Sequence, residues 1–167
     1  PSLEADKDLD VKTFIERGNG QFYEGPLAGR SLDGIDCLVL VGFPSSTSGS
    51  GPLSIISNAA AAGTPVLCVL SRTLDYSRLR ELEGVLPFFA QTGSRDEYQA
   101  FVEIPEAQRN NAILRLSTEV LGSEGWSKLP PIFKTHSSLR IKPEAEVLAV
   151  TRIQTAITTD PFLVARN

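Results

Sequence analysis

Two short, unbroken apolar runs constrain the fold of this chain more than any other feature. They occupy residues 36–43 (DCLVLVGF) and 66–70 (VLCVL), and an alanine-rich segment at residues 53–62 lies between them. Gly63 follows that segment, in the position where a glycine commonly ends a helix. Continuous apolar strands are typical of parallel sheets that helices cover on both faces. The order therefore predicts a right-handed βαβ unit whose two strands are adjacent, central and buried.

Further elements are expected on both sides of this unit. Residues 9–16 and 98–104 alternate in character and favour strands, and residues 75–83 favour a helix with Asp75 as its N-cap. Three β-type runs end the chain, at residues 138–142, 146–152 and 161–166, and Pro143-Glu144 suggests a hairpin between the first two. We predict an α/β fold: a mainly parallel sheet flanked by helices, with an antiparallel β extension at the C-terminus.

The length of 167 residues fits one domain with a substantial core. We interpret residues 1–125 as the α/β core and residues 126–167 as the β-rich extension. Hydrophobic residues make up 41% and charged residues 22% of the chain, which is ordinary globular usage. The chain contains no Met, and it reads as a fragment of a larger protein.

Composition also excludes several function classes. The net charge of −4 gives no basic surface for nucleic acid, and no apolar run reaches the ~18 residues of a membrane span. Two cysteines and one histidine, without a Cys/His cluster, do not make a zinc site. We expect a soluble domain with no cofactor, no metal, no nucleic-acid partner and no membrane contact of its own.

Candidate site residues lie in two loops at the carboxyl ends of the predicted strands, where open α/β sheets bind ligands. The loop at residues 44–52 (PSSTSGSGP) offers hydroxyl groups, and the helix after it offers free N–H groups, so it could hold an anion. Its alternative interpretation is a flexible surface loop, since it matches no phosphate-loop signature. The ligand-binding candidates are Ser45, Ser46, Thr47, Ser48, Gly49, Ser71 and Arg72.

Catalysis by the second loop is not indicated by the sequence. Ser71 would need a base, and His136 is the only histidine of the chain. The Gly-x-Ser-x-Gly motif of a serine nucleophile is also absent. We therefore assign no catalytic residue.

Several segments together resemble class I glutamine amidotransferase-like domains. They are AAAAGTPVLCVL, NNAILRL, WSKLPPIF, LRIKPEAEVLAV and PFLVAR. The resemblance covers residues 9–167 and is greatest to the uncharacterised domains of this kind in bacterial membrane proteins, which often also carry a von Willebrand A domain. It implies a flavodoxin-like, amidotransferase-like fold and a membrane-anchored parent protein, whose other domains are the candidate partners.

The same resemblance implies that the nucleophile is lost. In active members the strand after the Gly-x-Pro turn ends in the nucleophilic cysteine, and that pattern places Leu70 at this position. Cys68 falls two residues too early, and the tail lacks a His-x-Glu pair. The predicted function is a non-catalytic binding or interaction domain without glutaminase activity. The alternatives are a small-molecule hydrolase or transferase with its site at the C-terminal edge of the sheet, and a purely structural spacer.

Overall fold

The computed structural model describes residues 7–28, 32–115 and 125–166. These residues form a two-stranded antiparallel sheet, a two-stranded parallel sheet and a four-stranded antiparallel sheet. The strands are β1 (Glu16–Gly18), β2 (Gln21–Phe22), β3 (Leu38–Val41), β4 (Val66–Val69), β5 (Phe88–Glu103), β6 (Ile132–Ile141), β7 (Ala145–Ile153) and β8 (Ala156–Arg166). The helices are α1 (Ser50–Ala61) and α2 (Tyr76–Leu79), with 3-10 turns η3 (Arg80–Leu82), η4 (Glu106–Gln108), η5 (Ala112–Leu114) and η6 (Gly125–Lys128).

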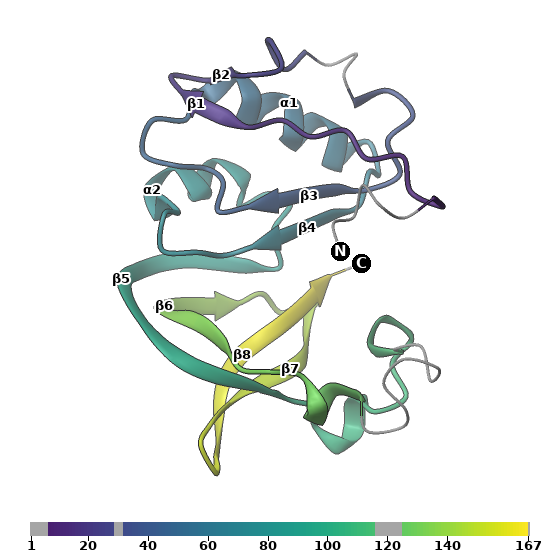
Figure 1. The fold of residues 1–167 in the computed structure, drawn as a ribbon, viewed down its shortest axis with the longest axis vertical. Helices are drawn as coiled ribbons and strands as arrows, with labels where there is room; N and C mark the ends of the chain where they lie inside the picture. Colours follow the sequence, from purple (N-terminus) through teal and green to yellow (C-terminus); the bar gives the residue numbers. More distant parts are fainter. Residues whose placement is uncertain (1–6, 29–31, 116–124, 167) are drawn as a thin grey trace.

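The predicted βαβ unit is present as β3, α1 and β4, and its strands pair in parallel. The helix is confirmed, although it begins earlier than the predicted start at residue 53. Gly63 ends it with a φ of +103°, a conformation that glycine adopts without strain. Leu53 and Ile56 of α1 share one core with Leu38 and Leu40 of β3. One face of the parallel pair is therefore covered by its own crossover helix (Figure 1).

Beyond this unit the predicted fold class is wrong. The chain does not form a mainly parallel, flavodoxin-like sheet flanked by helices, because β3 and β4 form a sheet of only two strands. Both are consequently edge strands. Burial alternates along β3, and Val39 and Val41 are exposed on the face opposite α1. A continuous apolar run does not distinguish a strand buried on both faces from one with apolar residues on an open face.

The largest sheet is antiparallel and has the strand order β6-β5-β7-β8. Its longest strand, β5, curves along the side of the lower half of the molecule in Figure 1. The strand predicted at residues 98–104 is confirmed as the end of β5. The sequence predicted antiparallel strands only in a C-terminal extension. In the structure these strands also pair with β5, and together they form the largest sheet of the described residues.

The hairpin predicted at Pro143-Glu144 is wrong. These residues join β6 to β7, yet in the described part of the chain both strands pair with β5 and not with each other. β6 pairs along most of β5, whereas β7 pairs with its end, Phe101–Glu103. The tail hairpin instead joins β7 to β8, at a turn where Gln154 has a φ of +52°. The strand predicted at residues 9–16 is also wrong, since β1 begins only at Glu16.

Helix α2 and the turn η3 connect the parallel unit to the antiparallel sheet. They confirm the helix predicted at residues 75–83, and Asp75 is its N-cap. The Asp75 Oδ1 accepts hydrogen bonds from the backbone N–H groups of Ser77 and Arg78, at 2.9 and 3.0 Å. The core of the βαβ unit continues through four buried side chains: Leu79, Leu82, Leu86 and Phe88.

Candidate functional site

The Ser/Gly loop after β3 folds onto a carboxylate from β1. Glu16 Oε2 accepts a hydrogen bond from the Ser48 hydroxyl at 2.6 Å and another from the Ser45 hydroxyl at 3.1 Å. The backbone N–H of Ser45 also donates to Ser48 Oγ, at 2.8 Å. These serines therefore already surround an anionic group of their own chain. A second negative charge beside Glu16 would be repelled, which disfavours the anion-binding interpretation of the loop.

The loop is also fixed to the β1–β2 hairpin through its backbone. The carbonyl of Thr47 accepts a hydrogen bond from the backbone N–H of Asn19 at 2.7 Å. Gly49 lies so close to Gly20 that a Cβ on Gly49 would come within 3.2 Å of the Gly20 Cα. These contacts hold the loop in place, so they disfavour the alternative interpretation of a flexible surface loop. The small residues of the loop allow it to pack closely against the hairpin.

The second loop lies against the first, as the strand-end argument predicted. The backbone N–H of Asp75 donates to the carbonyl of Pro44 at 2.8 Å. The Arg78 guanidinium donates to the carbonyl of Ser46 at 3.4 Å. The structure thus brings the two loops together at the carboxyl ends of β3 and β4.

Ser71 and Arg72, the candidates of this second loop, have partners within the chain. The hydroxyls of Ser71 and Thr73 lie 2.8 Å apart, within hydrogen-bonding distance. Both pack on Gly42, where a Cβ would lie only 2.6 Å from Ser71 Oγ. Arg72 forms an ion pair of 3.7 Å with Glu97 of β5. This geometry is that of a packed junction between loops, with the Ser71 hydroxyl paired to another hydroxyl.

His136 does not join Ser71 in the described contacts. Its imidazole stacks on the ring of Tyr98, with the ring centroids 4.5 Å apart. Among the hydrogen bonds of residues 7–28, 32–115 and 125–166, none connects His136 with Ser71. The geometry therefore does not favour a serine–histidine pair.

Cys68 and Leu70 occupy the region where the resemblance would place a nucleophile. Cys68 lies inside β4, opposite Leu40, and its burial raises the pKa of the thiol to about 11. At neutral pH the group is therefore a protonated thiol and a poor nucleophile. Leu70 follows β4 and packs, partly buried, against the core. Both residues have surroundings typical of structural side chains.

The face of the β3–β4 pair opposite α1 carries exposed apolar side chains. Four apolar side chains lie on it, and the register sets them opposite each other in two pairs: Val39 with Leu67, and Val41 with Val69. Their exposed fractions are 49, 46, 69 and 42%, respectively. We call this set the open β face. Their unbroken apolar pattern predicted a strand pair buried in a sheet, whereas in the structure these side chains form a surface.

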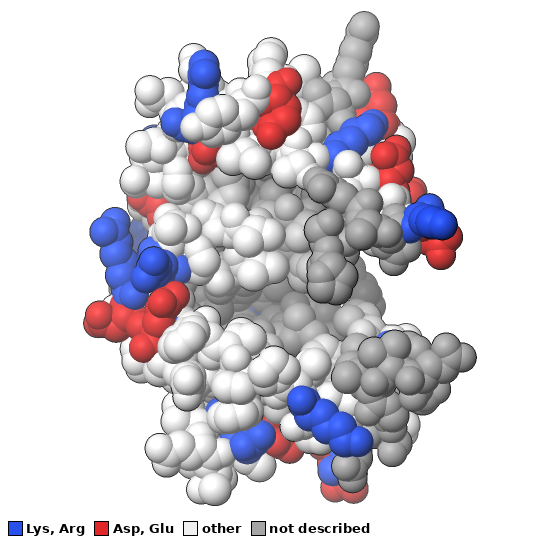
Figure 2. Space-filling model, in the orientation of Figure 1, with Lys and Arg blue, Asp and Glu red and all other residues white. Residues whose placement is uncertain are grey.

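Figure 2 shows how charged side chains are distributed over one face of the molecule. Charged side chains of the described residues lie mostly around the margin of the view, and uncharged side chains fill the described part of its middle, at the height of β3 and β4 in Figure 1. An uncharged centre with a charged margin resembles the organisation of protein–protein interfaces, which lack charge at their core.

A second group of residues without a predicted role lies on the antiparallel sheet. Tyr98 of β5, Lys134 of β6 and Asp160 of β8 meet there through hydrogen bonds of their side chains. Tyr98 and Asp160 are 62 residues apart in the sequence. No local motif links them, and the only available signal was the polar character of residues within β-type runs.

Comparisons with known proteins leave the family of the chain open. No protein-family model, no curated protein and no solved structure matches it. The resemblance to amidotransferase-like domains accordingly stays a prediction made from sequence motifs.

Two further properties apply to the residues that the structure describes. They contain no cluster of three or more His, Cys, Asp or Glu side chains arranged to hold a metal ion. None of their helices combines the length and apolar character that crossing a membrane requires.

Proposed function

We propose that this chain is a non-catalytic protein-interaction domain and that its partner docks on the open β face. The observation that supports this most directly is the pairing of Val39 with Leu67 and of Val41 with Val69 on a face where all four side chains are at least 42% exposed. Parallel sheets occur almost only with both faces covered. Among the residues that the structure describes, α1 covers one face of the β3–β4 pair, and the other face carries the four exposed side chains.

The gain from covering the open β face can be estimated. Full burial of a Val or Leu side chain contributes about 1.5–3 kcal/mol. These four side chains are still roughly half exposed, so covering them would contribute on the order of 4 kcal/mol before the costs of association. An apolar cluster of this size is comparable to the small group of residues that dominates a typical interface.

The partner surface that fits is apolar and flat, because the four side chains stand on a two-stranded sheet. Under this proposal the surface belongs to another domain of the same membrane-anchored parent protein, in keeping with the family that the motifs resemble. The alternative function, hydrolysis or group transfer at the strand ends, is not favoured by the geometry. There, the Ser71 hydroxyl pairs with Thr73, and Glu16 occupies the serine loop.

A peptide-display experiment tests the proposal even though the partner is unidentified. A random peptide library is selected on the wild-type chain and counter-selected on the double variant Val41→Ser/Leu67→Ser. The matched control is Ile157→Ser, which removes a side chain that is 63% exposed on β8. Binding of the enriched peptides to each variant is then measured by fluorescence anisotropy.

The proposal predicts apolar peptides that bind the double variant at least about tenfold more weakly than the wild type, a loss near 1.4 kcal/mol. Binding to Ile157→Ser should be unchanged. Peptides that bind all three proteins equally would contradict the proposal, as would enrichment of charged peptides only. Self-association of the wild type that the double variant abolishes would assign the face to a second copy of the chain instead.

A further inference from the structure

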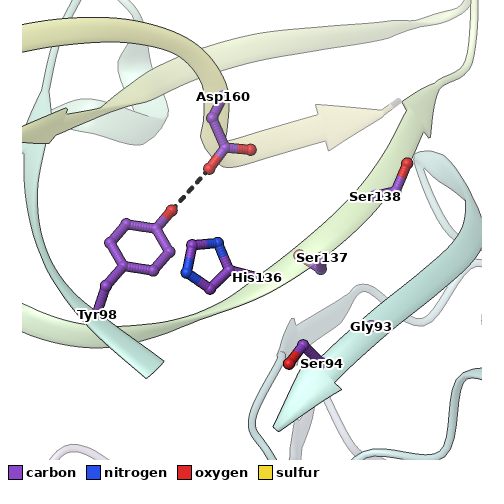
Figure 3. A pocket seen from close by; sticks show the side chains of 7 residues that line it. All are labelled: Gly93, Ser94, Tyr98, His136, Ser137, Ser138 and Asp160. Atoms are coloured by element: carbon purple, nitrogen blue, oxygen red, sulfur yellow. Dashed lines mark hydrogen bonds between the residues drawn. The ribbon is translucent and has the colours of Figure 1, made fainter. Parts of the chain in front are cut away.

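A hollow of about 480 Å³ lies on the antiparallel sheet, apart from the open β face. Figure 3 shows Tyr98 and His136 on one side of it, Asp160 above them, and the serine side chains on the other side. Its volume falls in the range of small-molecule sites, ~300–1,000 Å³. The hollow draws on three strands that the fold brings together: β5, β6 and β8. We call it the Tyr98 hollow.

The charges at the Tyr98 hollow are balanced within the chain. Asp160 Oδ2 forms an ion pair with Lys134 and accepts hydrogen bonds from the hydroxyls of Tyr98, at 2.9 Å, and Thr151, at 3.4 Å. The Lys134 side chain is only 15% exposed. The described hydrogen bonds to the Asp160 carboxylate all go to this one oxygen. The other oxygen, Oδ1, points toward the serine side of the hollow in Figure 3.

The protonation of Tyr98 fixes the direction of its hydrogen bond. Burial, followed by the hydrogen bond and charge of Asp160, raises the pKa of Tyr98 to about 12. The phenol is therefore protonated at neutral pH and donates to Asp160. It holds the carboxylate in place with its second oxygen available as an acceptor.

Besides these polar groups, the hollow has an apolar side formed by two aromatic rings, which we call the aromatic wall. The rings of Tyr98 and His136 are 4.5 Å apart with an interplanar angle of 32°. Facing this wall, the hydroxyl of Ser138 donates to Gln91 at 3.0 Å, and the hydroxyl of Ser94 donates to Asp96 at 3.0 Å. The Ser138 oxygen can still accept hydrogen bonds, and the Ser94 oxygen, which already accepts one from the backbone N–H of Asp96 at 3.0 Å, can accept one more.

From this arrangement we propose that the Tyr98 hollow binds a neutral, hydroxyl-rich small molecule of monosaccharide size. Hydroxyl groups of such a ligand would donate to Asp160 Oδ1 and to the serine oxygens, while its C–H face would pack on the aromatic wall. The expectation of a neutral ligand follows from the Lys134–Asp160 pair: the ammonium balances the carboxylate, so the pair offers no net charge that would attract an anion or a cation. The hollow is open to water, so the expected Kd is on the order of 1 mM.

The test is a ¹⁵N-NMR titration of the chain with single monosaccharides: glucose, galactose, mannose, N-acetylglucosamine and ribose. Inorganic phosphate and ethylamine serve as charged probes. Each is taken to about 50 mM, well above the expected Kd. His136→Ala is the site variant, because this exposed side chain can be removed with the fold intact. Ile157→Ser, on β8 but outside the hollow, is the control.

The proposal predicts saturable shifts at residues of the hollow with at least one sugar. His136→Ala should weaken that binding by about fivefold, the size of one aromatic contact, and Ile157→Ser should leave it unchanged. Absence of saturable shifts with every sugar would overturn the proposal. Phosphate or ethylamine binding at the same residues, as tightly as any sugar, would overturn the inference of a neutral ligand. Sugar binding that is equal in His136→Ala would remove the site from this hollow.

Discussion

The β3–α1–β4 unit and the antiparallel sheet differ in how far the side chains of their strands are buried. In the β3–α1–β4 unit the strands are apolar on both faces, but in the described parts of the chain (7–28, 32–115 and 125–166) only the face toward α1 is buried. In the antiparallel sheet the strands enclose their own interior, where Ala100, Leu148 and Thr151 are fully buried. Under the two proposals, the antiparallel sheet holds a small ligand in the Tyr98 hollow, and the open β face of the β3–β4 pair receives a macromolecule.

The largest expected effect comes from breaking the core that both halves share. Leu82 is fully buried between the parallel unit and the start of β5. Leu82→Ala should lower the free energy of unfolding by about 2–5 kcal/mol, through lost burial and the cavity left behind. Urea denaturation followed by fluorescence and by circular dichroism measures the change. Transitions that separate for the two probes would show that the halves do not unfold together.

The contact of α2 with β5 gives the next largest effect. A Cβ on Gly93 would lie 1.9 Å from Cε2 of Tyr76, so the ring must move. Gly93→Ala should destabilise the chain by about 1–3 kcal/mol through overpacking. Gly51→Ala in α1 is the control, because its Cβ meets open space. Equal stability of both variants in urea denaturation would contradict this close contact.

The N-cap of α2 predicts a smaller effect that depends on pH. The pKa of Asp75 is lowered, first by the hydrogen bond from the Ser77 hydroxyl and then by the backbone N–H of Arg78. The stabilisation is therefore present above the unfolded pKa of about 4 and is lost as the pH falls through the lower folded value. Asp75→Ala should cost about 1 kcal/mol at pH 7 and almost nothing in strong acid.

Asp75→Asn separates the cap from the charge, since asparagine also caps helices well. It should keep most of the stability at pH 7 and lose the dependence on acid. The check is thermal unfolding of the three proteins over a series of pH values. A constant difference between wild type and Asp75→Ala at every pH would contradict the role of the ionised carboxylate.

The smallest effect on stability is expected on the open β face. Val41 is 69% exposed, so Val41→Ser should change the free energy of unfolding by less than about 0.5 kcal/mol. Its neighbour Leu40 is 9% exposed, and Leu40→Ala should cost about 2–5 kcal/mol. Urea denaturation of this pair compares the two faces of one strand. A large cost for Val41→Ser would mean that the face is covered by the chain itself.

Local features of the fold could be predicted from the sequence, but its long-range pairings could not. The Asp75 cap, the Gly63 helix end and the βαβ unit depend on neighbouring residues, and all three are confirmed. The fold class was wrong because β5 follows α2 and pairs with β6, which no local pattern encodes. Pro143-Glu144 resembled a hairpin turn, although the strands that it joins pair elsewhere.

For the candidate sites, too, part of the arrangement could be predicted from the sequence, and the contacts between distant residues could not. The proximity of the loops that contain Ser45 and Ser71 could be predicted, because carboxyl ends of parallel strands meet at one edge. The contact of Glu16 with the serine loop could not be predicted, because Glu16 is far away in the sequence. The Tyr98 hollow depends on three strands whose pairing was not predicted, so its residues could not be grouped beforehand.

The central claim is that the face of β3 and β4 opposite α1 is open to solvent and available to a partner. Relaxation of ¹³C-labelled Val and Leu methyl groups by a soluble paramagnetic agent measures this directly in the free chain. We predict strong relaxation of Val39, Val41, Leu67 and Val69, and protection of Leu38, Leu40 and Leu53. Protection of Val41 equal to that of Leu40 would contradict the claim, because the face would then already be covered.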